Sequence, residues 1–172
     1  WKGLVGSEMC IRDRKNSNTT LVEELANSIL TYSDLLPSRN QNYKFDIEKF
    51  VDVNGKTGIY LQYAQVRAGK ILNQYQTQNN KEVLDNLNED ERKLVFEITK
   101  LPYYFLKSLE KNEPHHIAEY AYSLCQIFNS FYSNNKIFSS SITETVMNQR
   151  LFIVKSFYTT IHTVFELSLI HI

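Results

Sequence analysis

Apolar positions along the chain recur every three or four residues, which is the spacing of amphipathic α-helices. No segment yields a strand prediction, so the sequence predicts an all-α protein with a bundle of roughly four to five helices after residue 58. Pro102 is expected to kink or restart the chain inside this bundle. Helices are predicted over about 21–32, 47–51, 58–75, 88–101, 103–109, 114–132 and 141–167, with a short helical turn at 83–87.

Polar residues mark where several of these helices should begin. Thr57 is a suitable N-cap for the helix from residue 58, because its hydroxyl can accept a hydrogen bond from a free backbone N–H. Asn88 with Glu91, and Ser141 with Glu144, resemble capping boxes, in which each side chain bonds the backbone of the other residue.

Composition and charge narrow the classes of function. The 172 residues carry a formal net charge of zero, which argues against a nonspecific nucleic-acid binder, so any nucleic-acid contact needs a local patch. No apolar run is long enough to cross a bilayer, and we expect a soluble protein with no membrane partner. The two cysteines, Cys10 and Cys125, lie in unlike contexts, and free thiols in a reducing cytosol are expected.

Motifs for metal binding and catalysis are weak. His115 and His116 are adjacent, whereas two ligands on one helix face need a spacing of three or four residues. We expect the two rings to point apart with no cysteine or carboxylate cluster beside them, and we predict no metal site. The segment "NGKTG" at 54–58 lacks the spaced glycines of a phosphate-binding loop, and a helix-starting turn explains it. No catalytic centre is predicted.

One predicted helix carries a permanent cation on the face that bears its aromatic residues. Tyr60, Tyr63 and Arg67 share a face of the helix over 58–75. On composition alone, these tyrosines are core edges with exposed hydroxyls and Arg67 pairs with an acid. The functional alternative is binding of single-stranded RNA, whose bases stack on aromatic rings and guanidinium planes. The candidate contact residues are Tyr60, Tyr63, Arg67, Asn129, Tyr132 and Arg150.

Three ordered blocks resemble the C-terminal part of arginyl-tRNA synthetases. They are "FDIEKFVDVNGKTGIYLQYAQVRAGKIL" at 45–72, "HHIAEYAYSLCQIFNSFYSNNKIF" at 115–138 and "RLFIVKSFYTTIHTVFEL" at 150–167. The family pattern Gly-x-Thr-Gly-Pro-Tyr-x-x-Tyr-Ala-x-x-Arg is matched by Gly55, Thr57, Gly58, Tyr60, Tyr63, Ala64 and Arg67, with Ile59 in place of proline. The resemblance covers about residues 20–166.

This resemblance implies a domain organisation and a parent enzyme. Residues 15–57 would be the C-terminal end of a class I catalytic core, and residues 58–166 an all-α anticodon-binding domain of the DALR type. The parent would attach arginine to an arginine-accepting tRNA using ATP, in the cytoplasm and as a monomer. The ATP-binding motifs and the arginine pocket would lie upstream, so the chain should be inactive alone. The six candidate residues would lie near the anticodon arm.

The two ends of the chain look different from the rest. The segments "GSEMCIRDR" at 6–14 and "LSLIHI" at 167–172 resemble translated sequencing adapters. Residues 1–14 and 167–172 are therefore expected to be non-native or disordered tails, with a native flexible extension as the alternative. Two other functions stay open: a helical protein-interaction module without RNA binding, and the anticodon domain of another class I synthetase.

Overall fold

The computed structural model describes residues 19–38, 40–42, 46–50, 52, 55–75, 84–139 and 141–168. Within these ranges every regular element is an α-helix, which confirms the predicted fold class. The predicted tail at 1–14 lies outside the described residues, whereas residues 167 and 168 continue the last helix. The helices are α2 (Thr19–Leu35), α3 (Ile47–Phe50), α4 (Gly58–Gln74), α5 (Glu89–Thr99), α6 (Leu101–Lys111), α7 (His115–Asn134) and α8 (Glu144–Ser168).

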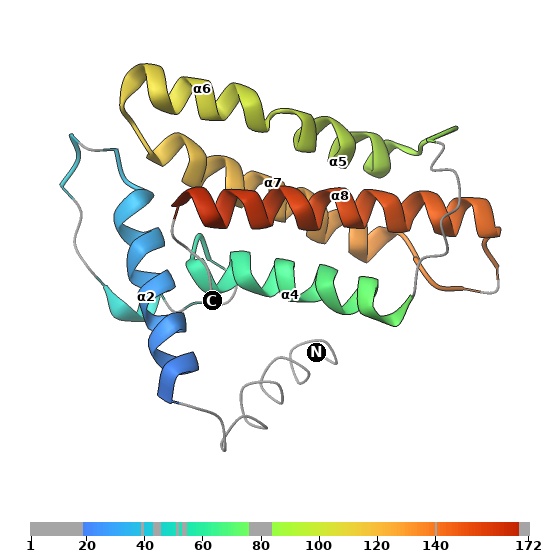
Figure 1. Ribbon diagram of the computed structural model, residues 1–172, viewed down its shortest axis with the longest axis horizontal. Helices are drawn as coiled ribbons and strands as arrows, with labels where there is room; N and C mark the ends of the chain where they lie inside the picture. The colour runs from blue at the N-terminus through green and yellow to red at the C-terminus, as the bar shows by residue number, and fades with distance from the viewer. Residues whose placement is uncertain are drawn as a thin grey trace.

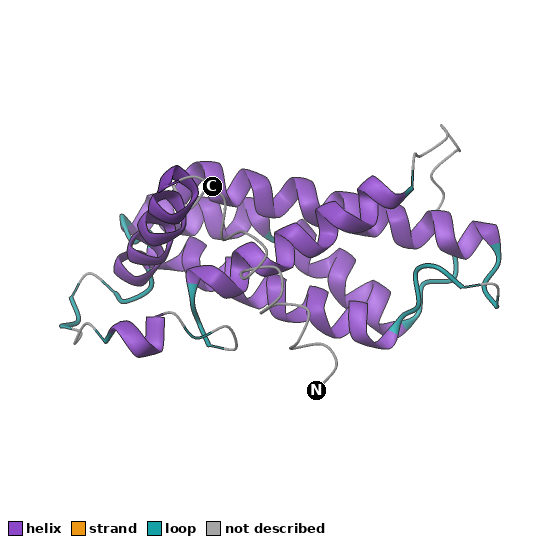
Figure 2. Cartoon of the chain, turned by 90° about the horizontal axis from the view of Figure 1, so that it is seen from below, coloured by secondary structure: helices purple, strands orange, loops and turns teal. Residues whose placement is uncertain are grey.

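Helix α7 is the centre of the bundle. It packs against α4, α5, α6 and α8, and also contacts α2, which crosses one end of the bundle (Figure 1). Its core face includes Phe128, whose ring stacks on that of Phe157 from α8 with centroids 3.9 Å apart and planes at 3°. Both rings are fully buried. Connecting segments gather at the two ends of the bundle (Figure 2), so any site built from loops must lie at one of these ends.

Two of the predicted helix starts are confirmed. Thr57 is the N-cap of α4, with extended backbone, and its hydroxyl oxygen accepts the N–H of Tyr60 at 3.2 Å. Asn88 and Glu91 form the predicted capping box at the start of α5, with both hydrogen bonds at 2.9 Å. These caps depend only on residues within one turn, which is why local sequence predicts them.

The capping box predicted for the last helix is wrong. Helix α8 begins at Glu144, and the hydroxyl oxygen of Thr143 accepts the N–H of Val146 at 3.4 Å. The hydroxyl of Ser141 instead bonds that of Ser139 at 2.8 Å. Two candidate hydroxyls stand close together here, and the one adjacent to the helix caps it.

Two predictions concern the break at Pro102 and the segment before α5. Helix α5 ends at Thr99 and α6 begins at Leu101 with Pro102 in its first turn, so the predicted restart is confirmed. The helical turn predicted at 83–87 is wrong for residues 84–87, which are not helical and include Asn86 at a φ of 49°. A left-handed residue interrupts a right-handed helix, and asparagine adopts this conformation more readily than most residues.

Helix α2 is tied closely to the rest of the bundle. Tyr32 is fully buried and its hydroxyl donates to the Ala118 carbonyl oxygen of α7 at 3.3 Å. Gly58 of α4 lies so close to α2 that an added Cβ atom would be 3.0 Å from the Ser28 carbonyl oxygen. The domain boundary at residues 57 and 58 stays a prediction. Among the described residues, no helix combines the length and hydropathy needed to cross a bilayer.

Candidate nucleic-acid interface

Arg67 joins α4 to α7 through two aromatic rings and an amide. Its guanidinium carbon lies 4.4 Å from the ring centroid of Tyr63, one turn earlier in α4, and 4.8 Å from that of Tyr132 in α7. One guanidinium nitrogen donates to Asn129 Oδ1 at 2.6 Å, and another donates to the Tyr63 hydroxyl oxygen at 2.8 Å. We call Tyr63, Arg67, Asn129 and Tyr132 the Arg67 cluster.

The cluster explains how a cation is accommodated between two packed helices. Arg67 donates to an amide oxygen and to a hydroxyl, and its guanidinium lies against two rings. Among the described residues it forms no ion pair with an acid. A planar guanidinium can offer its face to aromatic rings while its edge donates hydrogen bonds, which an ammonium cannot do. The four predicted residues are therefore brought together by the fold.

Tyr60 lies at the edge of the cluster and faces a different ring. Its ring centroid is 5.4 Å from that of Tyr122 in α7, and the side chain is partly buried. Burial raises the pKa of Tyr60, while a hydrogen bond from Asn129 opposes the shift. This residue stays neutral near pH 7. Lys56 lies 5.3 Å from the Tyr122 ring centroid, which adds a second cation on aromatic surface.

Arg150 lies apart from the cluster, and two of its nitrogens donate within the protein. Its Nε donates to Glu91 Oε1 at 2.7 Å, and Nη1 donates to the Lys136 carbonyl oxygen at 2.6 Å. The Glu91 side chain is 2% exposed and that of Arg150 13% exposed. These contacts favour a structural role, and the RNA contact predicted for Arg150 stays a prediction.

A groove of about 390 Å³ opens beside Tyr132 at one end of the bundle. Two of its aromatic side chains are accessible, since Tyr132 is 40% exposed and Phe138 41% exposed. Sequence reasoning missed Phe138 and the exposed Lys136, although both follow the "FNSFY" segment at 128–132 within six residues. The groove is lined by Ile71, Gln74, Tyr132, Ser133, Asn135, Lys136, Ile137 and Phe138.

Hydrogen bonds from neighbouring helices hold the loop that forms one wall of this groove. The Asn88 amide donates to Asn135 Oδ1 at 2.7 Å, and the Asn135 amide donates to the Phe131 carbonyl oxygen at 3.0 Å. Arg150 adds the bond to the Lys136 carbonyl oxygen. The loop after α7 is thus fastened to α5 and α8, so the groove is shaped before any ligand arrives.

Comparison with known proteins identifies the family of the chain. The family model described as the DALR anticodon binding domain matches residues 61–172, which is more than half of the chain. The chain belongs to the DALR anticodon-binding domain family. The match to this DALR model contains the whole Arg67 cluster, the groove and Arg150, and it begins one residue after Tyr60. It confirms the family resemblance drawn from the sequence.

Arginine–tRNA ligases are similar to the chain in sequence. An arginine–tRNA ligase of Francisella tularensis subsp. novicida is 36% identical over 126 residues, which are 69% of this chain and 22% of the relative. That of Hyphomonas neptunium is 37% identical over 114 residues, 66% of this chain and 19% of the relative. The chain thus spans about a fifth of their length.

Solved structures give the same picture of the fold. The arginyl-tRNA synthetase of Plasmodium falciparum matches with a TM-score of 0.81 at 26% identity, over 97% of this chain and 30% of that one. The Thermus thermophilus arginyl-tRNA synthetase matches with a TM-score of 0.78 at 23% identity, over 84% of this chain and 25% of that one.

Proposed function

We propose that the chain is the tRNA-binding, C-terminal part of an arginine–tRNA ligase, a class I enzyme that attaches arginine to its tRNA using ATP. The observation that carries the proposal is the Arg67 cluster bordering an open groove within a DALR match. ATP and arginine would be bound by the remaining part of the parent enzyme. A cytoplasmic, monomeric parent is an expectation that rests on the resemblance alone.

The groove has the chemistry to hold an unstacked nucleotide. The exposed rings of Tyr132 and Phe138 offer faces on which bases can stack. The exposed amide of Gln74 can donate to and accept from the edge of a base, and Lys136 can attract a phosphate. A basic excess over the whole chain is unnecessary for such a local site.

The Arg67 cluster adjoins this groove through a shared residue. Tyr132 belongs to both features, because its ring contacts the Arg67 guanidinium and also lines the groove. Arg67 and Asn129 hold α4 and α7 together at this point, and Tyr63 supplies a second ring. We therefore assign stacking to Tyr132 and positioning to Arg67, Tyr63 and Asn129.

The test is binding of an arginine-accepting tRNA to the 172-residue chain, measured by fluorescence anisotropy at two salt concentrations. Tyr132→Ala and Phe138→Ala should each weaken binding by about 1–3 kcal/mol, the value of one lost base stack. Tyr132→Phe should keep most of the affinity, because it keeps the ring.

The matched control is Tyr103→Ala on α6. Tyr103 is 61% exposed and lies away from the groove, so its loss should leave tRNA binding unchanged. If Tyr132→Ala folds normally and binds tRNA as tightly as the control, the assignment of the groove is wrong. Binding that is absent, or insensitive to salt, would favour the helical protein-interaction module instead.

A further inference from the structure

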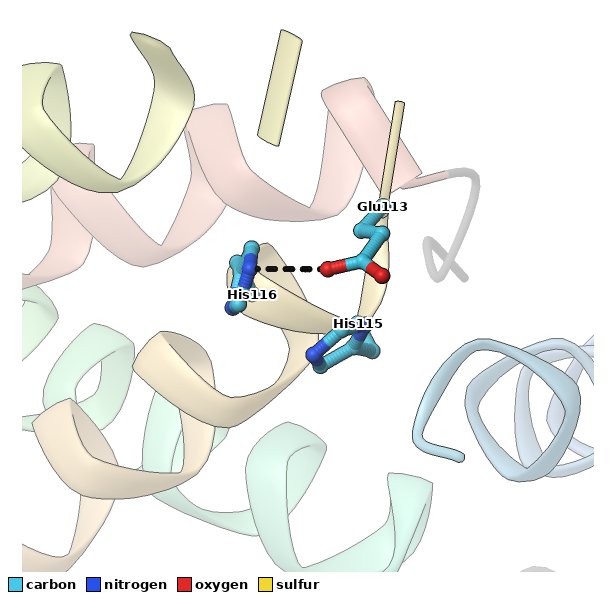
Figure 3. A group of neighbouring side chains, drawn as sticks. All are labelled: Glu113, His115 and His116. Carbon is cyan, nitrogen blue, oxygen red and sulfur yellow. Dashed lines mark ion pairs between the residues drawn. The ribbon is translucent and has the colours of Figure 1, made fainter. Parts of the chain in front are cut away.

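Two histidines and a glutamate meet at the turn between α6 and α7. One nitrogen of His115, one nitrogen of His116 and one carboxylate oxygen of Glu113 lie within 4.8 Å of one another (Figure 3). The two imidazole rings have centroids 4.1 Å apart. The sequence-based expectation that neighbouring histidines point apart, with no carboxylate beside them, is therefore wrong at this position.

Hydrogen bonds fix the turn that brings these groups together. Asn112 ends α6 in the left-handed conformation, with φ of 54°, and its N–H reaches the last carbonyl oxygens of that helix. The Glu113 N–H donates to the Ser108 carbonyl oxygen at 3.0 Å, and the Ser108 hydroxyl donates to the Glu113 carbonyl oxygen at 2.9 Å. The backbone that carries the carboxylate is thus held next to the start of α7.

Three of the four imidazole nitrogens in this group are buried and make no hydrogen bond among the described residues. The His116 side chain is 9% exposed, and neither of its ring nitrogens has a hydrogen-bond partner among the described residues. Its Nε2 atom forms an ion-pair contact with Glu113 Oε2 at 3.3 Å, and Nδ1 of His115 is buried without a hydrogen-bond partner. Buried polar groups in folded proteins are nearly always paired, so these nitrogens are candidates for binding a ligand.

We propose that Glu113, His115 and His116 bind a divalent transition metal ion, with zinc as the best match. Two imidazole nitrogens and one carboxylate oxygen form a donor set that zinc accepts, with a fourth position left for water. Zinc bonds of about 2.0–2.2 Å require the three side chains to rotate toward the ion. Binding would link the end of α6 to the start of α7 and is independent of tRNA binding.

Nearby positive charges limit the affinity of this group for a cation. Lys107 and Lys111 carry positive charge close enough to the His116 ring to act on it electrostatically. The two lysines also repel a cation, and we expect micromolar rather than tighter binding.

The experiment titrates zinc chloride into the 172-residue chain at about pH 7.5 by isothermal calorimetry. A Cys10→Ser background removes a competing thiol. We expect one zinc ion per chain, a weakening of about tenfold or more in His116→Gln, and no change in the controls His162→Gln and His171→Gln. Cobalt(II) in place of zinc should give the visible absorption of a tetrahedral site, and that absorption should be lost in Glu113→Gln.

Two results would overturn the proposal: no zinc binding by the parent chain, or binding that the His116 and Glu113 replacements leave intact. If His116→Gln fails to fold, the variant of the half-buried His115 is tested instead. His115→Gln should abolish the increase in melting temperature that zinc produces in the parent chain. An unchanged zinc-dependent increase in that variant would likewise refute the site.

Discussion

Replacing Arg150 with methionine tests whether this arginine supports the fold or contacts RNA. The substitution keeps a long side chain but removes the ion pair with Glu91 Oε1 at 2.7 Å and the bond to the Lys136 carbonyl oxygen at 2.6 Å. The Glu91 carboxylate then stays in a position that is 2% exposed without its cation. An unpaired buried charge is strongly destabilising.

The magnitude follows from what Glu91 retains. Removing one partner of a buried pair costs about 3–5 kcal/mol. The Glu91 Oε2 atom still accepts the Asn88 N–H at 2.9 Å and the Gln149 amide at 3.2 Å, and the Arg150 side chain is 13% exposed. We therefore expect the lower end of that range, a loss of about 3 kcal/mol. For a domain of this size the melting temperature should fall by about 6–12 °C.

Urea unfolding followed by circular dichroism measures this loss, and the double variant Glu91→Gln with Arg150→Met provides the control. Because the second change removes the uncompensated charge, the double variant should be more stable than Arg150→Met alone. The structural assignment of Arg150 is refuted if Arg150→Met changes the free energy of unfolding by less than about 0.5 kcal/mol while tRNA binding is lost. That result would make Arg150 a direct RNA contact.

Three further predictions test packing and protonation. Gly58→Ala should destabilise the fold by about 1–3 kcal/mol in urea unfolding, because the added methyl group meets the α2 backbone. Gly69→Ala should stay within about 1 kcal/mol, because its methyl group meets only the side chain of Tyr158. Burial lowers the pKa of His116, so on acidification this histidine is protonated at a higher pH in the unfolded chain than in the folded one. The free energy of unfolding should therefore fall as the pH falls from about 7 to about 5.5. His116→Gln should reduce this pH dependence. The buried Cys125 thiol, whose pKa burial raises, should resist iodoacetamide at about pH 8 until urea unfolds a Cys10→Ser chain, as mass spectrometry can show.

Local sequence predicted most helices, because their signals act over a few residues. The cap at Thr57, the box of Asn88 and Glu91, and the break at Pro102 each depend on groups within one turn. The prediction failed at Ser141, where several hydroxyls compete and short-range rules do not choose among them. The prediction that the His115 and His116 rings point apart failed for a related reason. The spacing rule describes the interior of a helix, whereas these residues stand at its start, where neighbouring side chains can converge.

The candidate site was only partly predictable, because its parts come from distant segments. Helical spacing placed Tyr63 and Arg67 on one face of α4, but nothing in that spacing identifies Asn129, 62 residues away, as the acceptor for the guanidinium. The groove beside Tyr132 needs the loop after α7, whose position depends on hydrogen bonds to α5 and α8. Such contacts are determined by tertiary packing and leave no periodic trace in the sequence.

The cation at position 67 is best explained by what an apolar residue could not do there. An aliphatic side chain would pack on the Tyr63 and Tyr132 rings but would leave the Asn129 amide oxygen without its donor at a partly buried position. The guanidinium satisfies that oxygen and the Tyr63 hydroxyl while it covers aromatic surface. It also leaves Tyr132 40% exposed at the border of the groove. The arginine therefore joins two helices and presents an aromatic face to solvent, and the second property is the one an RNA-binding surface needs.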